Sequence, residues 1–317
     1  MEQKKLLFIY NPTAGKGVLK QKLSDVIEEF MKAEYEVTIY ATRREHEATE
    51  LVFELSENYD RIVCSGGDGT LHEVTEGLMQ LPEEKRRPCG YIPAGTVNDF
   101  ANALALPGKP EEDAKVAVSG KINSYDIGSM NGSYFNYIAA FGAFTSVSYE
   151  TPQSFKNAMG RAAYFIEGLI KLPSIHPYHL IIRGDKGIEI EDDFIFGMVT
   201  NARSVGGFPI FRKTKMELND GVFEGVFVKN PKNPIELQSV VNAFLTESSN
   251  DQIIAFRSSK FEILCDDEVS YTLDGEDGGN FKKVVIKNHK AAVYYANADK
   301  MQKKGRIKSM EDRNGNR

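Results

Sequence analysis

The chain of 317 residues is 41% hydrophobic, which is enough to bury a sizeable core and favours two domains over one. Its formal net charge of −6 argues against a general basic face for binding nucleic acid. Three cysteines without metal-site spacing, Cys64, Cys89 and Cys265, predict reduced thiols in a cytoplasmic protein. No window approaches the ~20 apolar residues that span a bilayer, and the first apolar run is too short for a secretory signal.

Strands and helices are predicted to alternate over the first third of the chain. Short apolar runs end in loops, and apolar residues at helical spacing follow these loops. The predicted strands are residues 6–10, 37–40, 62–64 and 89–93, and helices are expected from about residue 19, over 47–55, from about 69, from about 99 and over 109–119. This alternation predicts a parallel sheet whose loops gather at its carboxyl edge.

The central loop joins a buried strand to a helix through a glycine-rich turn, residues 65–70. Glycines let the backbone approach oxygen atoms closely, and the amides of the first helical turn point at a bound anion. Asp68 in the middle of the turn would repel phosphate unless a divalent cation lies between them. The turn therefore predicts a phosphate and cation site, and the alternative is a tight strand-to-helix turn without a ligand.

Two further loops are expected at the same edge of the sheet. Residues 11–17 contain small residues, a hydroxyl and Lys16, but they lack the Walker spacing and also suit an ordinary turn. Residues 94–100 end in Asn98 and Asp99, either of which can cap the next helix. Three loops with such residues at one edge indicate a phosphate site more strongly than any one of them.

The second region is expected to be built mainly from short strands. Residues 122–130 and 134–141 are predicted to form a hairpin around the favoured two-residue turn Asn131–Gly132. Further strands are predicted at 178–183, 188–200, 222–228, 253–256, 260–264 and 269–273. Their alternating pattern suggests an antiparallel sandwich that begins near Asp126.

Two helices are expected to interrupt these strands. Residues 155–172 carry apolar residues broadly on one side, with Lys156, Arg161 and Lys171 nearby. This pattern suits a membrane-facing helix and equally a core helix with a solvated face. Residues 234–244 predict an ordinary helix. The polar tail, residues 301–317, is expected to be disordered.

Two acidic clusters follow strands in the second region. One contains Asp274, Glu276 and Asp277, and the other contains Glu217 and Asp220. Both are Asp-Gly sequences typical of exposed hairpin turns, and that interpretation stays open for each.

The three loops together resemble the diacylglycerol kinase catalytic-domain family. The matching segments are residues 11–16, 66–73 and 93–100, and the similarity runs through nearly the whole chain. The central motif also occurs in NAD kinases, so the first and third segments point to lipid kinases. The chain is most similar to soluble bacterial diacylglycerol kinases.

The resemblance implies an α/β fold of two domains. Residues 1–126, with a segment returning at about 284–300, would form a parallel-sheet nucleotide-binding domain. Residues 127–283 would form a mainly antiparallel β-sandwich that binds the lipid substrate.

The resemblance also implies a set of functional residues. The ATP site would comprise Asn11, Pro12, Thr13, Ala14, Gly15, Lys16, Thr42, Gly66, Gly67, Asp68, Gly69, Thr70, Leu71, His72, Glu73, Thr96 and Asn98. Thr42 has no signal of its own, and His72 is expected to be a surface helix residue rather than a catalyst. A structural Mg²⁺ would be bound by Asp220, with Glu217 and the carbonyl of Val222 as companions, since hard oxygen ligands suit it.

The implied function is ATP-dependent phosphorylation of the hydroxyl of diacylglycerol, giving phosphatidic acid. Asp68 would orient Mg²⁺, and either Asp274 or Glu276 would accept the hydroxyl proton. The lipid lies in a bilayer, so peripheral contact with the inner membrane surface is expected, and family members are often homodimers. The alternatives are an NAD kinase-like enzyme, a kinase of a sphingoid or another glycerolipid, and a non-catalytic nucleotide-binding module.

Overall fold

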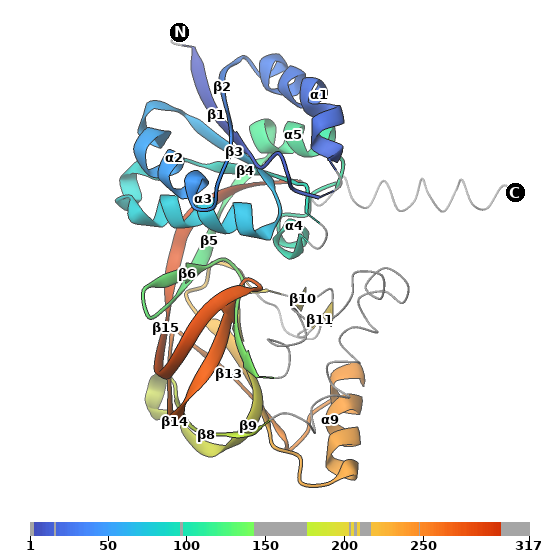
Figure 1. The fold of residues 1–317 in the computed structure, drawn as a ribbon, viewed down its shortest axis with the longest axis vertical. Coiled ribbons are helices and arrows are strands. Elements are labelled where there is room, and N and C mark those ends of the chain that lie inside the picture. The colour runs from blue at the N-terminus through green and yellow to red at the C-terminus, as the bar shows by residue number, and fades with distance from the viewer. Residues whose placement is uncertain are drawn as a thin grey trace, which may run out of the picture. The chain divides into compact units, whose positions relative to one another are not determined.

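The computed structural model describes residues 3–15, 17–95, 98–142, 176–202, 204–205, 208–209, 217–246 and 248–298 (Figure 1). The chain divides into two compact units, residues 1–125 with 292–317 and residues 126–291. The return to the first unit was predicted at residue 284, which is too early. Val284 and Ile286 instead belong to the core of the second unit. The predicted helix 155–172 and the tail 301–317 lie outside the described residues.

The first unit contains a parallel sheet in the order β15-β4-β3-β1-β2. Its strands are β1 (Lys4–Tyr10), β2 (Tyr35–Ala41), β3 (Arg61–Gly66), β4 (Cys89–Pro93) and the last part of β15 (Glu276–Asn297). Its helices are α1 (Val18–Lys32), α2 (Glu47–Leu55), α3 (Asp68–Gln80), α4 (Asp99–Ala103) and α5 (Pro110–Ser119), with short 3-10 turns at Ser56–Asn58 and Glu83–Lys85. The predicted alternation of strands and helices therefore agrees with the structure.

Helices α1 and α5 lie on one side of this sheet and α2 and α3 on the other (Figure 1). On the α1 side, Phe30 packs its ring edge-on against Phe8 of β1, with ring centroids 5.3 Å apart. Val26 of α1 and Ala117 of α5 join the same buried cluster. These apolar faces recur at helical spacing in the sequence, so each helix buries one stripe against the strands.

The second unit is built from antiparallel strands. The strands are β7 (Ile138–Gly142), β8 (Tyr178–Arg183), β9 (Glu189–Thr200), β12 (Phe223–Lys229), β13 (Ile253–Ser258), β14 (Lys260–Leu273), most of β15, and the hairpin of β5 (Lys121–Met130) with β6 (Ser133–Phe135). The two-stranded pair β10 (Ser204–Val205) and β11 (Phe208–Pro209), the turn Asp185–Gly187 and helix α9 (Pro234–Thr246) complete the described elements.

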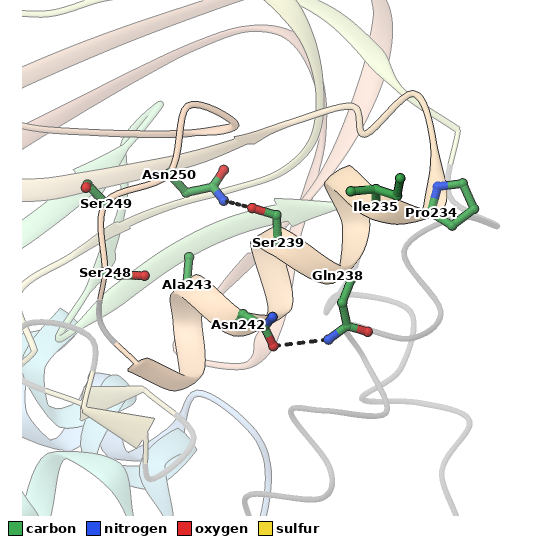
Figure 2. A pocket seen from close by; sticks show the side chains of 9 residues that line it. All are labelled: Pro234, Ile235, Gln238, Ser239, Asn242, Ala243, Ser248, Ser249 and Asn250. Atoms are coloured by element: carbon green, nitrogen blue, oxygen red, sulfur yellow. Dashed lines mark hydrogen bonds between the residues drawn. The ribbon is translucent and has the colours of Figure 1, made fainter.

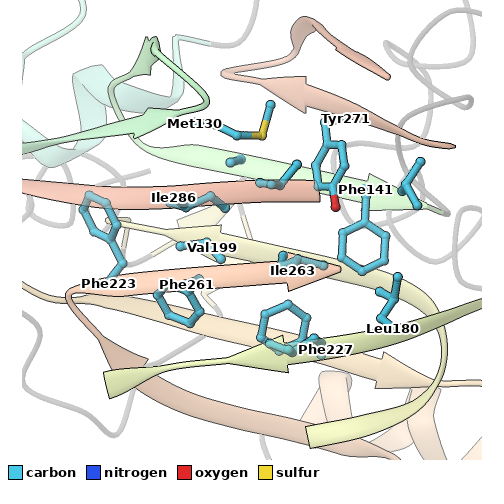
Figure 3. Close-up of a cluster of buried hydrophobic side chains, with 14 of the residues drawn as sticks. Met130, Phe141, Leu180, Val199, Phe223, Phe227, Phe261, Ile263, Tyr271 and Ile286 are labelled. Carbon is cyan, nitrogen blue, oxygen red and sulfur yellow. The ribbon is translucent and has the colours of Figure 1, made fainter. Parts of the chain in front are cut away.

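Two strands, β7 and β8, each pair with both of the long strands β9 and β14. The pairings with β8 lie at one end of the long strands, and the pairings with β7 lie at the other end. These four strands are thus linked in a closed hydrogen-bonded path, and their inward side chains include Phe141, Leu180 and Ile263 (Figure 3). The antiparallel pairing agrees with the prediction, and the pairing joins these strands as one continuous sheet.

Three predicted strand boundaries in this unit are wrong. The predicted strand 134–141 is interrupted at Asn136 and Tyr137, which separate β6 from β7. The two predicted strands 260–264 and 269–273 are one strand, β14, with a register shift between Leu264 and Val269. The predicted returning segment at about 284–300 likewise belongs to one longer strand, β15, which begins at Glu276. The turn at Asn131–Gly132 is confirmed, and both residues have the positive φ that such a turn requires.

Helix α9 borders a shallow cavity of about 480 Å³ (Figure 2). Its lining is uncharged and contains none of the predicted site residues. Asn250 donates to Ser239 at 2.6 Å across it. Within the described ranges, no helix is long and apolar enough to cross a membrane.

Candidate active site

The three predicted loops of the first unit meet at the carboxyl edge of the parallel sheet. The N–H of Asn11 donates to the carbonyl of Ser65 at 2.8 Å, and the N–H of Ala94 donates to the carbonyl of Gly66 at 2.8 Å. These two bonds tie the ends of β1, β3 and β4 together. The loops therefore lie side by side, as the parallel alternation predicted.

Glycine is required where these loops touch. A Cβ added to Gly15 would lie 1.9 Å from the carbonyl oxygen of Ala94, and the φ of Gly15 is +61°. A Cβ added to Gly95 would lie 2.7 Å from the Cα of Gly67. Both distances are below any real contact, so substitution of either glycine would force the loops apart.

The first loop is folded on itself. The side-chain oxygen of Asn11 accepts hydrogen bonds from the N–H of Thr13 at 2.9 Å and from its hydroxyl at 2.8 Å. This Asx turn, together with the bond from the N–H of Ala14 to the carbonyl of Asn11 at 3.3 Å, fixes the backbone from Asn11 to Ala14. Thr42 belongs to the same edge, because its N–H donates to the carbonyl of Tyr10 at 2.9 Å. Lys16 lies outside the described residues.

The central loop leads directly into α3. The helix begins at Asp68, one residue earlier than predicted, and the preceding Gly67 is extended and provides no side-chain cap. The first N–H groups of a helix have no partner within it, which is why a turn of this kind suits an anion. Gly69 and Thr70 continue this first turn, while the side chain of Leu71 is buried and its N–H donates to the carbonyl of Gly67 at 3.2 Å.

The last two residues of the central motif lie on the body of α3. Glu73 faces α2, where its carboxylate accepts the N–H of Ala48 at 3.2 Å and its carbonyl accepts the hydroxyl of Thr49 at 2.9 Å. The structure therefore gives Glu73 a role in helix packing. His72 is partly exposed on the same helix, as expected for a surface residue.

The third loop is held by Asn98. Asn98 occupies the position before α4 with a φ of 52°, but its side chain makes no capping bond. Its Oδ1 instead accepts the N–H of Gly95 at 3.0 Å, and its Nδ2 donates to the carbonyl of Gly95 at 2.7 Å. Asn98 is thus the N-cap residue, as one of the two predicted alternatives had it, but its side chain closes the loop instead of capping α4. Thr96 lies outside the described residues.

In the second unit, Asp126 organises the acidic turn at residues 217–222. Its buried carboxylate accepts the N–H of Gly221 at 2.7 Å, the N–H of Ala291 at 2.7 Å and the side-chain amide of Asn288 at 3.0 Å. Its own N–H donates to the carbonyl of Leu218 at 2.8 Å. From the sequence, Asp126 was predicted only to mark the domain boundary, and this role was not predicted.

The predicted magnesium ligand Asp220 lies on this turn. Its Oδ1 accepts the N–H of Val222 at 3.2 Å, and its Oδ2 forms an ion pair with Arg257. Arg257 also forms an ion pair with Glu224 at 3.1 Å. Burial raises the pKa of the Glu224 carboxyl to about 7. Glu217 is exposed at the start of the turn.

The chemistry of the donors at this turn fits Mg²⁺. The carboxylates of Glu217 and Asp220 and the carbonyl of Val222 are all hard oxygen ligands. Within the described ranges, no group of three or more His, Cys, Asp or Glu side chains is arranged to hold a metal ion. Backbone oxygens or water would therefore have to complete the coordination.

The other acidic cluster separates into residues with different environments. Asp274 is 4% exposed and, with φ at 52°, forms the β14–β15 turn together with Gly275. Glu276 is exposed at the first position of β15. Asp277 is also exposed, and its carboxylate accepts the N–H of Gly279 at 2.9 Å. Asp274 therefore lies in a hairpin turn, as one interpretation predicted, but its side chain is buried rather than exposed, while Glu276 is open to solvent.

Glycine-rich loops that meet at a helix N-terminus on the edge of a parallel sheet are an arrangement typical of kinases and other phosphate-binding proteins. The family model for the diacylglycerol kinase catalytic domain matches residues 5–130. A curated relative, diacylglycerol kinase from Bacillus subtilis (strain 168), is 36% identical over 282 residues, which cover 87% of this chain and 91% of the relative. The chain belongs to the diacylglycerol kinase family, and its activity is that of a lipid kinase.

Solved structures share the fold. A candidate diacylglycerol kinase from Bacillus anthracis (strain Sterne) superposes with a TM-score of 0.79 at 26% identity, covering 94% of this chain and 96% of the other. An NAD kinase from Archaeoglobus fulgidus in complex with ATP has a TM-score of 0.52 at 16% identity, covering 93% and 94%. The second likeness shows a common fold alone.

Proposed function

We propose that this protein transfers the γ-phosphoryl group of ATP to the free hydroxyl of diacylglycerol, giving phosphatidic acid and ADP. The observation that carries the proposal is the meeting of the three loops at the N-terminus of α3. Membership of the diacylglycerol kinase family supports the lipid acceptor. In this reaction the bond from the γ-phosphorus to the bridging oxygen breaks, and a bond to the lipid oxygen forms.

The loops would bind the nucleotide mainly through their backbones. The N–H groups proposed to contact phosphate oxygens are those of Gly15, Gly67, Gly69 and Thr70, because Pro12 has no N–H and those of Asn11, Thr13 and Ala14 donate within the protein. Lys16 and Thr96 are proposed to contribute a cation and a hydroxyl to the same site. A bound Mg²⁺ would neutralise phosphate charge, and Asp68 is proposed to hold it, as Asp220, Glu217 and Val222 are proposed to hold the structural ion.

We assign the general base to Glu276 rather than to Asp274. A general base must reach its substrate and have a free lone pair. Four hydrogen bonds from Asn136, Tyr137 and Ile138 engage both oxygens of Asp274. Glu276 is exposed, and among the described residues it has no ion pair or side-chain hydrogen bond.

The acceptor also defines where the enzyme works. Diacylglycerol resides in a bilayer, so the protein is proposed to act from the cytoplasm as a peripheral enzyme at the inner membrane surface. It is proposed to do so as a homodimer and without binding nucleic acid, consistent with the negative net charge.

An acceptor competition tests this function. The full chain is incubated with γ-labelled ATP, Mg²⁺ and mixed micelles of diacylglycerol, with NAD and sphingosine offered in parallel. Label is expected in phosphatidic acid alone, and Asp68→Asn should reduce it at least about a hundredfold, because the catalytic cation loses its ligand. Label in NADP or in a sphingoid phosphate would show that NAD or sphingosine, rather than diacylglycerol, is the acceptor. ATP binding without transfer to any acceptor would show that the protein is a nucleotide-binding module.

A further inference from the structure

Tyr91 of β4 is fully buried below two of the three loops. Its hydroxyl lies 3.2 Å from the carbonyl oxygen of Gly66 and 3.2 Å from Oδ1 of Asn98. Gly66 begins the central glycine-rich turn, and Asn98 closes the third loop. One phenol oxygen is therefore within hydrogen-bonding distance of both loops.

Each of these acceptors has a second donor. The N–H of Ala94 donates to the carbonyl of Gly66 at 2.8 Å, and the N–H of Gly95 donates to Oδ1 of Asn98 at 3.0 Å. A phenol has one proton, so Tyr91 donates to only one of the two acceptors at a time. Loss of the hydroxyl would leave neither acceptor unpaired, and its main consequence would be on the spacing of the loops.

Tyr91 remains a hydrogen-bond donor throughout the physiological range. Burial raises the pKa of Tyr91 far above its ordinary value, and the negative charge of Asp68 raises it further. The hydroxyl is thus a neutral donor within reach of both Gly66 and Asn98.

We propose that Tyr91 is a positioning residue, whose hydroxyl sets the spacing between the Gly66–Asp68 turn and the Gly95–Asn98 loop and so tunes affinity for nucleotide phosphates. This inference rests on the proposed function, since it assumes that these loops bind the nucleotide. Backbone N–H groups bind phosphate tightly only when they are already in the binding geometry. Loops whose spacing is less fixed are therefore expected to bind phosphate more weakly.

The test is Tyr91→Phe in the full chain, which removes one oxygen atom and no apolar volume. The Kd for ADP is measured by calorimetry, together with KM for ATP, KM for diacylglycerol and kcat. Both nucleotide constants are expected to rise about three- to tenfold, the effect of one neutral hydrogen bond. The thermal midpoint, KM for diacylglycerol and kcat should stay close to those of the wild type.

The matched control is Tyr35→Phe. Tyr35 is a buried tyrosine at the start of β2 that packs in the core between the sheet and α1. Its loss of a hydroxyl should leave all four kinetic and binding constants unchanged. A merely structural effect of removing a buried phenol would instead appear in both variants as a lower thermal midpoint.

An ADP affinity in Tyr91→Phe equal to that of the wild type overturns the proposal, as does a fall in kcat with both nucleotide constants unchanged. If Tyr91→Phe does not fold, Asn98→Ala removes the loop-side partner, and unchanged ADP affinity there overturns the proposal equally. Failure of the proposed function looks different, because the wild-type chain itself would then give no labelled phosphatidic acid, whether or not it binds nucleotide.

Discussion

The carboxylate of Asp274 accepts the backbone N–H of Asn136 at 2.6 Å, where the chain leaves β6 and enters β7. The same carboxylate accepts the N–H groups of Tyr137 at 3.0 Å and Ile138 at 3.2 Å. The N–H of Asp274 in turn donates to the carbonyl of Ile138 at 2.9 Å. Asp274 therefore links the β14–β15 turn by hydrogen bonds to the segment between β6 and β7. These bonds fix the position of Glu276 at the start of β15.

Substitution Asp274→Asn should destabilise the second unit. The amide can accept on one atom only, and its NH₂ group would face N–H donors that the carboxylate now satisfies. We expect a loss of about 2–4 kcal/mol in the free energy of unfolding. Urea unfolding followed by circular dichroism measures this loss. An unchanged unfolding midpoint with abolished activity would instead make Asp274 the base.

Substitution Glu276→Gln should lower activity and leave the stability of the protein unchanged. The side chain is exposed and makes no side-chain hydrogen bond in the described part of the chain, so the urea midpoint should not move. Loss of a general base should lower kcat by about a hundredfold or more. Asp277→Asn, one residue further along β15, is the matched control and should retain wild-type kcat. Equal activity of both variants would remove Glu276 from the mechanism.

The loops could be predicted from the sequence because their chemistry is local. A buried strand, a glycine-rich turn and an amphipathic helix each leave a pattern within a few residues, and parallel alternation brings such turns to one edge. The φ of +61° at Gly15 and the close approach of Gly95 to Gly67 explain why glycine stands at both positions. The Asn131–Gly132 turn was predictable for the same reason.

The role of Asp126 could not be predicted, because its hydrogen-bond partners come from distant parts of the sequence. Gly221, Asn288 and Ala291 approach it only when the second unit is folded. The unbroken course of β14 was missed for a different reason. The polar run 265–268 looks like a loop, and the strand instead passes through it with a register shift.

Substitution Asp126→Asn should loosen the 217–222 turn. The carboxylate of Asp126 accepts three hydrogen bonds. In the Asn variant, the NH₂ group would face at least one of these N–H donors and could not accept its hydrogen bond. We expect a loss of about 2–4 kcal/mol in the free energy of unfolding, together with weaker Mg²⁺ binding measured by calorimetry. Asp267→Asn, at an exposed position on β14, is the control. Wild-type stability in Asp126→Asn would show that the buried carboxylate is dispensable.

His179 provides a pH-dependent contribution to the stability of the second unit. Its Nδ1 lies 2.9 Å from Asp193 across the β8–β9 pair, and its Nε2 lies 3.2 Å from Glu191. Hydrogen bonds to Asp193 first and Glu191 second raise the pKa of His179 above its ordinary value of 6.5. The folded protein therefore binds the imidazole proton more tightly than the unfolded chain does.

The sign of the pH dependence follows from this raised pKa. The stabilisation is fully present below pH 6.5 and is lost as the pH rises through the pKa of the folded protein. Proton NMR titration of the His179 ring should give a pKa above 6.5 in the wild type. Asp193→Asn should lower that pKa more than Glu191→Gln does, and His179→Asn should flatten the slope of stability against pH in this range. A wild-type pKa at or below 6.5, or the reverse order of the two carboxylates, would contradict this assignment.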